Sequence, residues 1–99
     1  PAWRAQKMGD LEVWKKPLKN GDIAVGLFNR SDKPQRITVS WMCLDIAGKW
    51  KARDLWAHKD LGEFEGGYSC EPAGHEMVVL RFSRIPDPAP AQLPSGGQK

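Results

Sequence analysis

The sequence lacks any apolar run close to the roughly 20 residues that a membrane-spanning helix needs. It also lacks a secretory signal and an initiating methionine, and it opens with Pro1-Ala2-Trp3-Arg4. We expect such a chain to be a processed product or a piece of a longer protein, with no membrane partner. Its 99 residues suffice for one domain, and 40% hydrophobic and 27% charged residues make an ordinary globular composition.

Cysteine and histidine are scarce, which argues against structural metal sites. Cys43, Cys70, His58 and His75 are the soft ligands of the sequence, and none pair at the Cys-Cys or His-His spacings of structural zinc. Two cysteines allow at most one internal disulfide, which leaves the redox compartment open. Cys70 alternates in phase with Tyr68, so we expect a buried free thiol. The sequence predicts no metal site and no cofactor.

Glycine-rich phosphate loops and basic stripes are absent as well. Gly66-Gly67 lies within a strand-like alternation and indicates a bulge or a bend. The net charge is only +3, and Lys49, Lys51 and Arg53 alternate as on the solvated face of a strand. A nucleic-acid-binding protein would carry a basic stripe with aromatic residues or glycine inside it. The sequence therefore predicts no nucleic-acid partner.

Two strand patterns joined by a turn dominate residues 22–41. Both alternating faces of residues 23–28 are apolar, so this strand should be central and buried. Apolar and polar side chains alternate in residues 36–41, and residues 29–34 (NRSDKP) are typical of a turn. We predict a hairpin here, which needs further strands or a second sheet to cover its apolar face.

Shorter alternating segments fill the chain as far as residue 84. They are residues 11–16, 49–54, 63–70 and 76–83, with a lead-in at 1–8, one helical turn within 42–48 and a loop at 55–62. The fold class predicted is all-β: an antiparallel, Greek-key-like β-sandwich of about seven to eight strands. We assign residues 1–84 to this sandwich. Residues 85–99 (IPDPAPAQLPSGGQK) are predicted to form a disordered, Pro-rich tail or linker.

The five tryptophans fall into two groups. Trp41 and Trp50 alternate with the inward-facing positions and are predicted to be in the core. Trp3, Trp14 and Trp56 are less clearly inward. They are candidates for contact with a neighbouring domain or with a sugar, because sugar-binding modules stack pyranose rings on exposed aromatic planes. Contact with a neighbouring domain is the simpler interpretation.

No catalytic residue is predicted. No cleft-like constellation of acidic or nucleophilic residues is visible in the sequence. Glu63 and Glu65 share one strand face and are interpreted as solvated partners of nearby basic residues. Asp54 follows Arg53 at a strand end and is expected to hold the next turn. His75, which leads the last strand, is expected to be a hydrogen-bonded residue that fixes the preceding turn.

Several blocks of the sequence resemble a known family, the C-terminal antiparallel β domain of family 27 glycoside hydrolases, the α-galactosidases or melibiases. The blocks are residues 9–14 (GDLEVW), 17–18 (PL), 24–25 (AV), 29–31 (NRS), 53–62 (RDLWAHKDLG), 72–75 (PAGH) and 78–81 (VVLR). The resemblance runs from about residue 3 to residue 83, and residues 53–62 are its most specific part.

The resemblance implies a parent enzyme that removes terminal α-galactosides by a retaining mechanism, with two aspartates in a (β/α)₈ barrel. None of those catalytic motifs occurs in this sequence, so this segment is expected to be non-catalytic. Its implied work is to pack on the barrel and stabilise it, and the barrel is then its partner. The alternative is a carbohydrate-binding module for galactosides. A secreted or periplasmic location follows from the resemblance alone, and the parent's substrate stays open.

Overall fold

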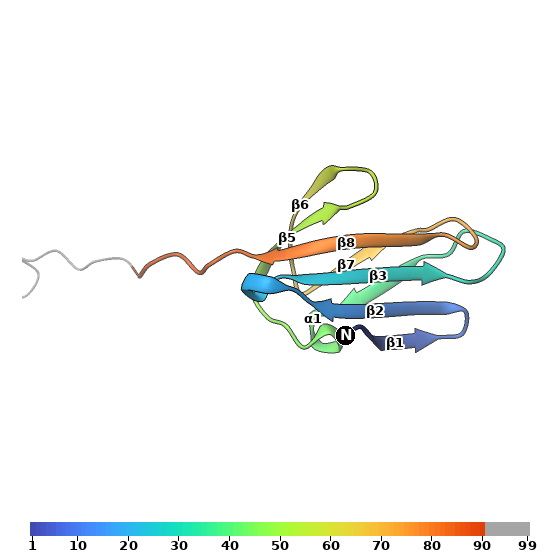
Figure 1. The fold of residues 1–99 in the computed structure, drawn as a ribbon, viewed down its shortest axis with the longest axis horizontal. Helices are drawn as coiled ribbons and strands as arrows, with labels where there is room; N and C mark the ends of the chain where they lie inside the picture. Colours follow the sequence, from blue (N-terminus) through green and yellow to red (C-terminus); the bar gives the residue numbers. More distant parts are fainter. Residues whose placement is uncertain (91–99) are drawn as a thin grey trace, which may run out of the picture.

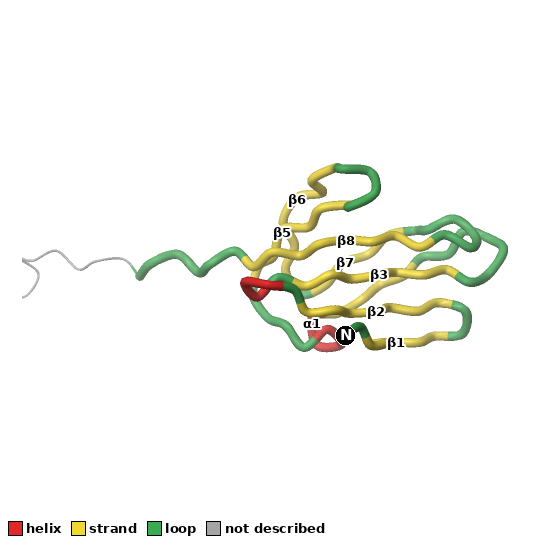
Figure 2. Tube along the Cα trace, viewed as in Figure 1, coloured by secondary structure: helices red, strands yellow, loops and turns green. Residues whose placement is uncertain are grey.

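The protein is an all-β domain in a computed structural model that describes residues 1–90 (Figures 1 and 2). The chain forms β1 (Trp3–Met8), β2 (Leu11–Pro17), the 3₁₀ turn η1 (Lys19–Gly21), β3 (Ile23–Asn29), β4 (Ile37–Ser40), α1 (Trp41–Leu44), β5 (Lys49–Asp54), β6 (Lys59–Glu65), β7 (Gly67–Cys70) and β8 (Met77–Arg84). A six-stranded sheet has the order β1-β2-β3-β8-β5-β6, and β4 pairs with β7 in a second sheet. The pairings are antiparallel. The predicted fold class is confirmed.

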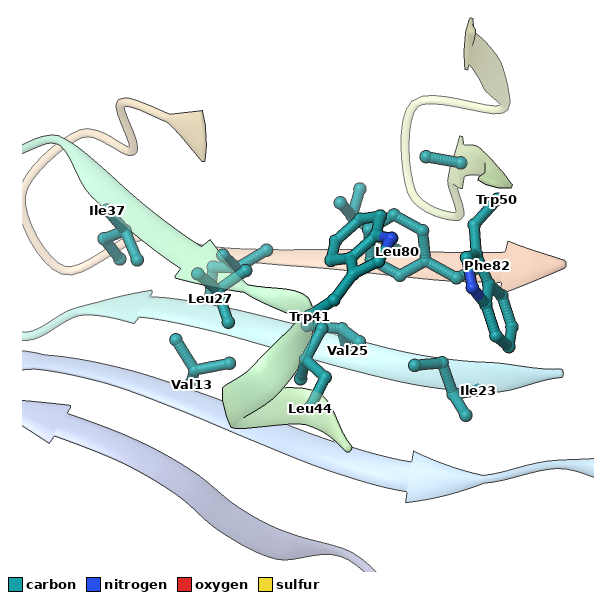
Figure 3. Close-up of a cluster of buried hydrophobic side chains, with 12 residues drawn as sticks. Val13, Ile23, Val25, Leu27, Ile37, Trp41, Leu44, Trp50, Leu80 and Phe82 are labelled. Carbon is teal, nitrogen blue, oxygen red and sulfur yellow. The ribbon is translucent and has the colours of Figure 1, made fainter. Parts of the chain in front are cut away.

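The core lies between the large sheet on one side and the small sheet with α1 on the other (Figure 3). Leu27, Leu80 and Phe82 of the large sheet are fully buried, as are Ile37 and Val39 of the small one. Alternation explains these positions, since successive side chains of a strand point to opposite faces.

Both tryptophans that the sequence assigned to the core lie there, each with 4% of its surface exposed. Trp41 meets Phe82 edge to face, with ring centroids 5.5 Å apart. Each indole N–H is satisfied, that of Trp41 by the carbonyl of Gly48 and that of Trp50 by the carbonyl of Ala47. A buried tryptophan needs such a partner, because an unpaired polar group costs free energy in the core.

Strand β3 is central, as predicted, and lies between β2 and β8. Its burial alternates strictly: Ile23, Val25 and Leu27 are buried, whereas Ala24 and Gly26 are half-buried. The second apolar face of β3 therefore lacks the cover that the first one has.

The predicted hairpin of residues 22–41 is wrong, because β3 and β4 belong to different sheets. The connection between them crosses the sandwich. Asn29 is fully buried and holds this crossing: its Nδ2 donates to the carbonyls of Lys33 (2.6 Å) and Pro72 (3.1 Å). Its Oδ1 accepts hydrogen bonds from the backbone N–H and the hydroxyl of Ser31. Turn-forming residues thus build a crossover here.

Two other local predictions are also wrong. Residues 3–8 are edge strand β1 rather than a lead-in, and residues 59–62 are part of β6 rather than of a loop. Residues 63–70 do not form one strand, since the chain bends at Gly66 (φ +83°) and passes into the small sheet. The bend itself was predicted at Gly66-Gly67. Phe64 and Tyr68 still face the same core, with ring centroids 4.9 Å apart.

The predicted helical turn is α1. Ser40 caps it by accepting a hydrogen bond from the N–H of Cys43, and Asp45 ends it in the left-handed region (φ 56°). Lys15 reaches across from β2, and its Nζ donates to the carbonyl of Leu44. A cation at the C-terminal end of a helix turn is favourable, because the last carbonyls lack backbone partners there.

Residues 85–90 have no regular secondary structure, and Ile85 is tied to β5 by a hydrogen bond from its N–H to the carbonyl of Lys49. The remainder of the predicted tail, residues 91–99, lies outside the described residues. The division into 1–84 and 85–99 stays a prediction. Within residues 1–90, no helix has the length and apolar character to cross a membrane.

Replacing Gly74 with alanine should destabilise the domain. An added Cβ would lie 2.5 Å from the backbone carbonyl carbon of Asp32, in the crossing that Asn29 holds. We expect a loss of about 2–3 kcal/mol in the free energy of unfolding, typical of overpacking. Gly9→Ala is the control, because Gly9 has positive φ but open space around it. Urea unfolding checks both variants, and a smaller loss for Gly74→Ala than for Gly9→Ala would contradict this account.

Candidate interaction surface

One face of the large sheet is apolar and has no layer of the described chain over it. We call this the outer face. Its residues are Trp14, Ala24, Gly26, Phe28, Met77 and Val79, from three adjacent strands. They lie in register, with Trp14 opposite Gly26 and Gly26 opposite Val79. In Figure 1 the small sheet lies on one side of the large sheet, with β7 behind β8 and β3. The outer face is on the other side.

A hollow of about 280 Å³ lies in the middle of the outer face. Small residues, Ala24 and Gly26, occupy its centre, and Trp14 and Val79 flank them. The Met77 side chain lies over Gly26, since a Cβ there would be 3.4 Å from the Met77 methyl carbon. The hollow therefore results from side-chain size: Gly26 of β3 leaves a gap, and larger side chains of the neighbouring strands β2 and β8 surround it.

A recessed carboxylate fixes one end of this surface. The Glu12 side chain is only 4% exposed, and it accepts hydrogen bonds from Trp14 Nε1 (2.9 Å) and Arg30 Nη1 (3.1 Å). Arg4 forms a longer ion pair with it, at 3.8 Å. Arg30 in turn lies over the ring of Phe28, 6.0 Å from its centroid. Glu12 thus sets the orientation of the Trp14 indole.

These contacts lower the pKa of Glu12 below its ordinary value. The hydrogen bond from Trp14 is the main cause, and the hydrogen bond and charge of Arg30 and the charge of Arg4 act in the same direction. Removal of the carboxylate from water opposes them. The carboxylate is therefore ionised at neutral pH and holds two arginines at the edge of the apolar surface.

Ion pairs border the other side of the outer face. Arg81 Nε donates to Asp22 Oδ2 at 2.8 Å, and the hydroxyl of Ser83 donates to the same oxygen. Arg53 pairs with Asp60 at 2.8 Å across the β5–β6 hairpin. An apolar centre with a polar, hydrogen-bonded rim is the usual anatomy of a protein–protein interface.

The structure does not gather the three candidate tryptophans. Trp14 lies on the outer face, half-buried. Trp3, in edge strand β1, is opposite the inward-facing Lys15, whose Nζ lies 5.5 Å from the Trp3 ring centroid. Trp56 is 66% exposed in the turn between β5 and β6. Only Trp14 is part of the apolar surface.

The turn that carries Trp56 is held by hydrogen bonds to a side chain of the turn. Asp54 Oδ1 accepts hydrogen bonds from the backbone N–H groups of Trp56 (3.0 Å) and Ala57 (2.9 Å), as expected of an aspartate that holds a turn. His58 closes the turn with φ 55°. The neighbouring Leu55 N–H donates to the carbonyl of Val79, so this turn adjoins the edge of the outer face.

The other residues considered for chemistry serve structure. Glu63 and Glu65 stand opposite Lys51 and Lys49 in the β5–β6 register, as interpreted from the sequence. Cys70 is a free, half-buried thiol whose pKa burial raises to about 11. Such a thiol is a poor nucleophile, because the thiolate is the reactive form. Among residues 1–90, no three His, Cys, Asp or Glu side chains are arranged to hold a metal ion.

Cys43 and His75 are the two remaining candidates. Cys43 is free and exposed on α1. His75 fixes its loop through the backbone, since its N–H donates to the carbonyl of Ser31 at 2.9 Å. Its φ is 63°, and its side chain is exposed. The predicted turn contact is present, but the imidazole does not make it.

The structure is thus an antiparallel β-sandwich domain with one uncovered apolar face. The family model of the alpha-galactosidase C-terminal beta sandwich domain matches residues 8–82. The chain therefore belongs to this family, the C-terminal β-sandwich domains of α-galactosidases.

Individual relatives agree with this membership. An α-galactosidase of Oryza sativa subsp. japonica is 40% identical over 81 residues, which are 78% of this chain and 19% of the relative. An α-galactosidase of Coffea arabica is 37% identical over 81 residues, 78% of this chain and 21% of the relative. The chain spans about a fifth of the length of the curated relatives it matches.

Solved structures share the fold. A family 27 β-L-arabinopyranosidase of Geobacillus stearothermophilus superposes with a TM-score of 0.82 at 30% identity, over 86% of this chain and 20% of that chain. Alpha-galactosidase I of Mortierella vinacea gives a TM-score of 0.80 at 27% identity, over 85% of this chain and 23% of that chain.

The Glu12→Gln variant should lose part of the pH dependence of stability. A carboxyl with a lowered pKa in the folded state stabilises above its unfolded pKa, about 4.3 for glutamate, and loses this contribution as pH falls through the folded value. Glutamine has no charge to lose. We expect the wild type to lose more stability than Glu12→Gln between neutral pH and about pH 3.

Urea unfolding followed by tryptophan fluorescence measures this difference at several pH values. Glu63→Gln is the matched control, because Glu63 is an exposed carboxylate of β6, away from the Glu12 cluster. If the curve of Glu12→Gln runs parallel to that of the wild type, Glu12 does not act as described.

Proposed function

We propose that this chain is the non-catalytic accessory domain of an α-galactosidase-like glycoside hydrolase, and that its outer face packs on the (β/α)₈ barrel of the parent enzyme. The parent would be a retaining enzyme that acts on terminal α-galactosides. The single observation that carries the docking proposal is the apolar, uncovered face of a sheet whose central strand is apolar on both sides.

The physical argument rests on the cost of leaving this face in water. Sheets that are apolar on both faces are normally covered on both faces. Burying apolar surface stabilises by about 25 cal/mol per Å², so a docked outer face would stabilise the parent through its half-exposed large side chains. The chain spans about a fifth of its relatives, which leaves most of the parent to supply the cover.

The polar side chains that border the outer face are held in fixed positions, which also supports a protein partner. Glu12 holds the Trp14 indole and two arginines in place, so little side-chain freedom is lost on docking. Preorganised side chains of this kind favour association, because the entropic cost of ordering them has been met during folding. Tryptophan and arginine are also the residues that most often carry binding energy at interfaces.

Sugar binding is the alternative, and exposed Trp56 is the residue that favours it. The hollow of the outer face suits a saccharide poorly. Its lining is largely apolar, whereas sugar hydroxyls need polar partners, and the indole N–H of Trp14 already donates to Glu12. A galactoside-dependent change in the amide spectrum at Trp56 would favour this alternative.

Met77→Lys should weaken docking in the full-length parent enzyme. The substitution places a charge in the centre of the outer face, where docking would have to remove it from water. Met42→Lys is a matched control, because Met42 is 89% exposed on α1, on the other side of the domain. We expect Met77→Lys to raise the rate at which a protease separates the two parts by at least roughly tenfold, equivalent to 1.4 kcal/mol. Met42→Lys should leave it unchanged.

The same substitutions in the 99-residue chain distinguish weakened docking from a loss of stability within the domain. Met77 points away from the core, so Met77→Lys should change the urea midpoint of the isolated chain little. Equal protease sensitivity of the two lysine variants in the parent would contradict docking through the outer face. So would a loss of stability that is as large in the isolated chain as in the parent.

A further inference from the structure

Three cationic side chains lie in one row across the outer side of the large sheet. The strand register places Lys16 opposite Ala24, Ala24 opposite Arg81, and Arg81 opposite Arg53. This row directly follows the row of Trp14, Gly26 and Val79, two residues further along each strand. The cations therefore border the apolar outer face and project to the same side of the sheet.

The Arg53–Arg81 juxtaposition is unfavourable within the domain. Like charges directly opposite on neighbouring antiparallel strands destabilise a sheet. Asp22 neutralises Arg81, but the partner of Arg53 is Asp60, whose side chain is 83% exposed. An ion pair that is so exposed contributes little. Arg81 thus has a structural partner in Asp22, whereas the exposed pair with Asp60 gives little reason, within the sandwich alone, for a second arginine at position 53.

A hollow of about 200 Å³ lies where the two arginines meet, and Lys51, Ala52, Asp60 and Ser83 complete its lining. Arg81 uses Nε for Asp22, and Arg53 uses Nη1 for Asp60. A guanidinium group has five N–H donors in a planar fork, so each arginine keeps further donors for a second acceptor. The lining is of mixed charge, because it includes Asp60 and because Glu63 stands opposite Lys51. What it offers to a further anionic group is the free guanidinium donors of the two arginines.

We propose that this hollow, in which Arg53 and Arg81 keep free guanidinium donors, is a docking subsite that receives an acidic side chain of the parent barrel. The inference rests on the docking proposed above and specifies its chemistry. A carboxylate matches the guanidinium fork with two parallel hydrogen bonds, and it relieves the repulsion between the arginines. The apolar outer face supplies affinity, and the charge pair fixes the orientation of the two parts.

The experiment uses the full-length parent enzyme with both Arg53 and Arg81 replaced by glutamine. We expect a protease to separate the two parts roughly tenfold faster than in the wild type at about 50 mM salt, because a charge-assisted contact is lost. The difference should shrink at about 1 M salt, where the Debye length is only about 3 Å. Arg36→Gln is the matched control, because Arg36 is an exposed arginine that precedes β4 of the small sheet.

Two outcomes would overturn the proposal. The first is wild-type behaviour of the double variant in the parent. If Met77→Lys still loosens the parent, the subsite alone is wrong; if Met77→Lys also has no effect, docking through the outer face is wrong as well. The second is a loss of stability in the 99-residue chain that is as large as the loss in the parent. This result would mean that the arginines act within the domain rather than in docking. We expect a modest loss in the isolated chain, because the Arg81–Asp22 ion pair is removed, and a clearly larger loss in the parent.

Discussion

The organisation of the domain depends on covering strand β3, whose side chains are apolar on both faces. One face is covered by other elements of the same domain: the small sheet and α1 bury Ile23, Val25 and Leu27. The other face, with Ala24 and Gly26, keeps an apolar surface in contact with water. Hydrophobic burial is the dominant favourable term in folding and in association, so the same strand connects the stability of the sandwich with its proposed work in a larger enzyme.

Polar side chains at the connections between the two sheets fix how the small sheet and α1 pack on the inner face of the large sheet. Asn29 joins the crossing after β3 to Pro72, and Ser40 caps the turn of helix that follows β4. Lys15 carries a charge into the interior and donates to the end of α1. Asn29 and Lys15 are buried, where a polar group must be paired. They hold the two sheets in one arrangement.

The sequence predicted what depends on local alternation and failed where distant segments decide. Alternation correctly made β3 a central strand and placed Trp41 and Trp50 in the core. It did not predict that β3 and β4 separate, because the same turn-forming residues suit a hairpin and a crossover; the deciding bond from Asn29 to Pro72 spans 43 positions. The recess around Glu12 was also missed, since a glutamate in a strand is ordinarily solvated. Its partner Arg30 lies 18 residues away, and no local signal indicates the pair.

The most direct test of the account is a comparison of methionine oxidation in the 99-residue chain and in the full-length parent, read by mass spectrometry. Met77 lies over the hollow of the outer face, and Met42, which is 89% exposed on α1, serves as the internal reference. Docking through the outer face predicts that Met77 is oxidised much more slowly in the parent than in the isolated chain, while Met42 reacts equally in both. The same Met77-to-Met42 ratio in the two proteins would contradict the central claim.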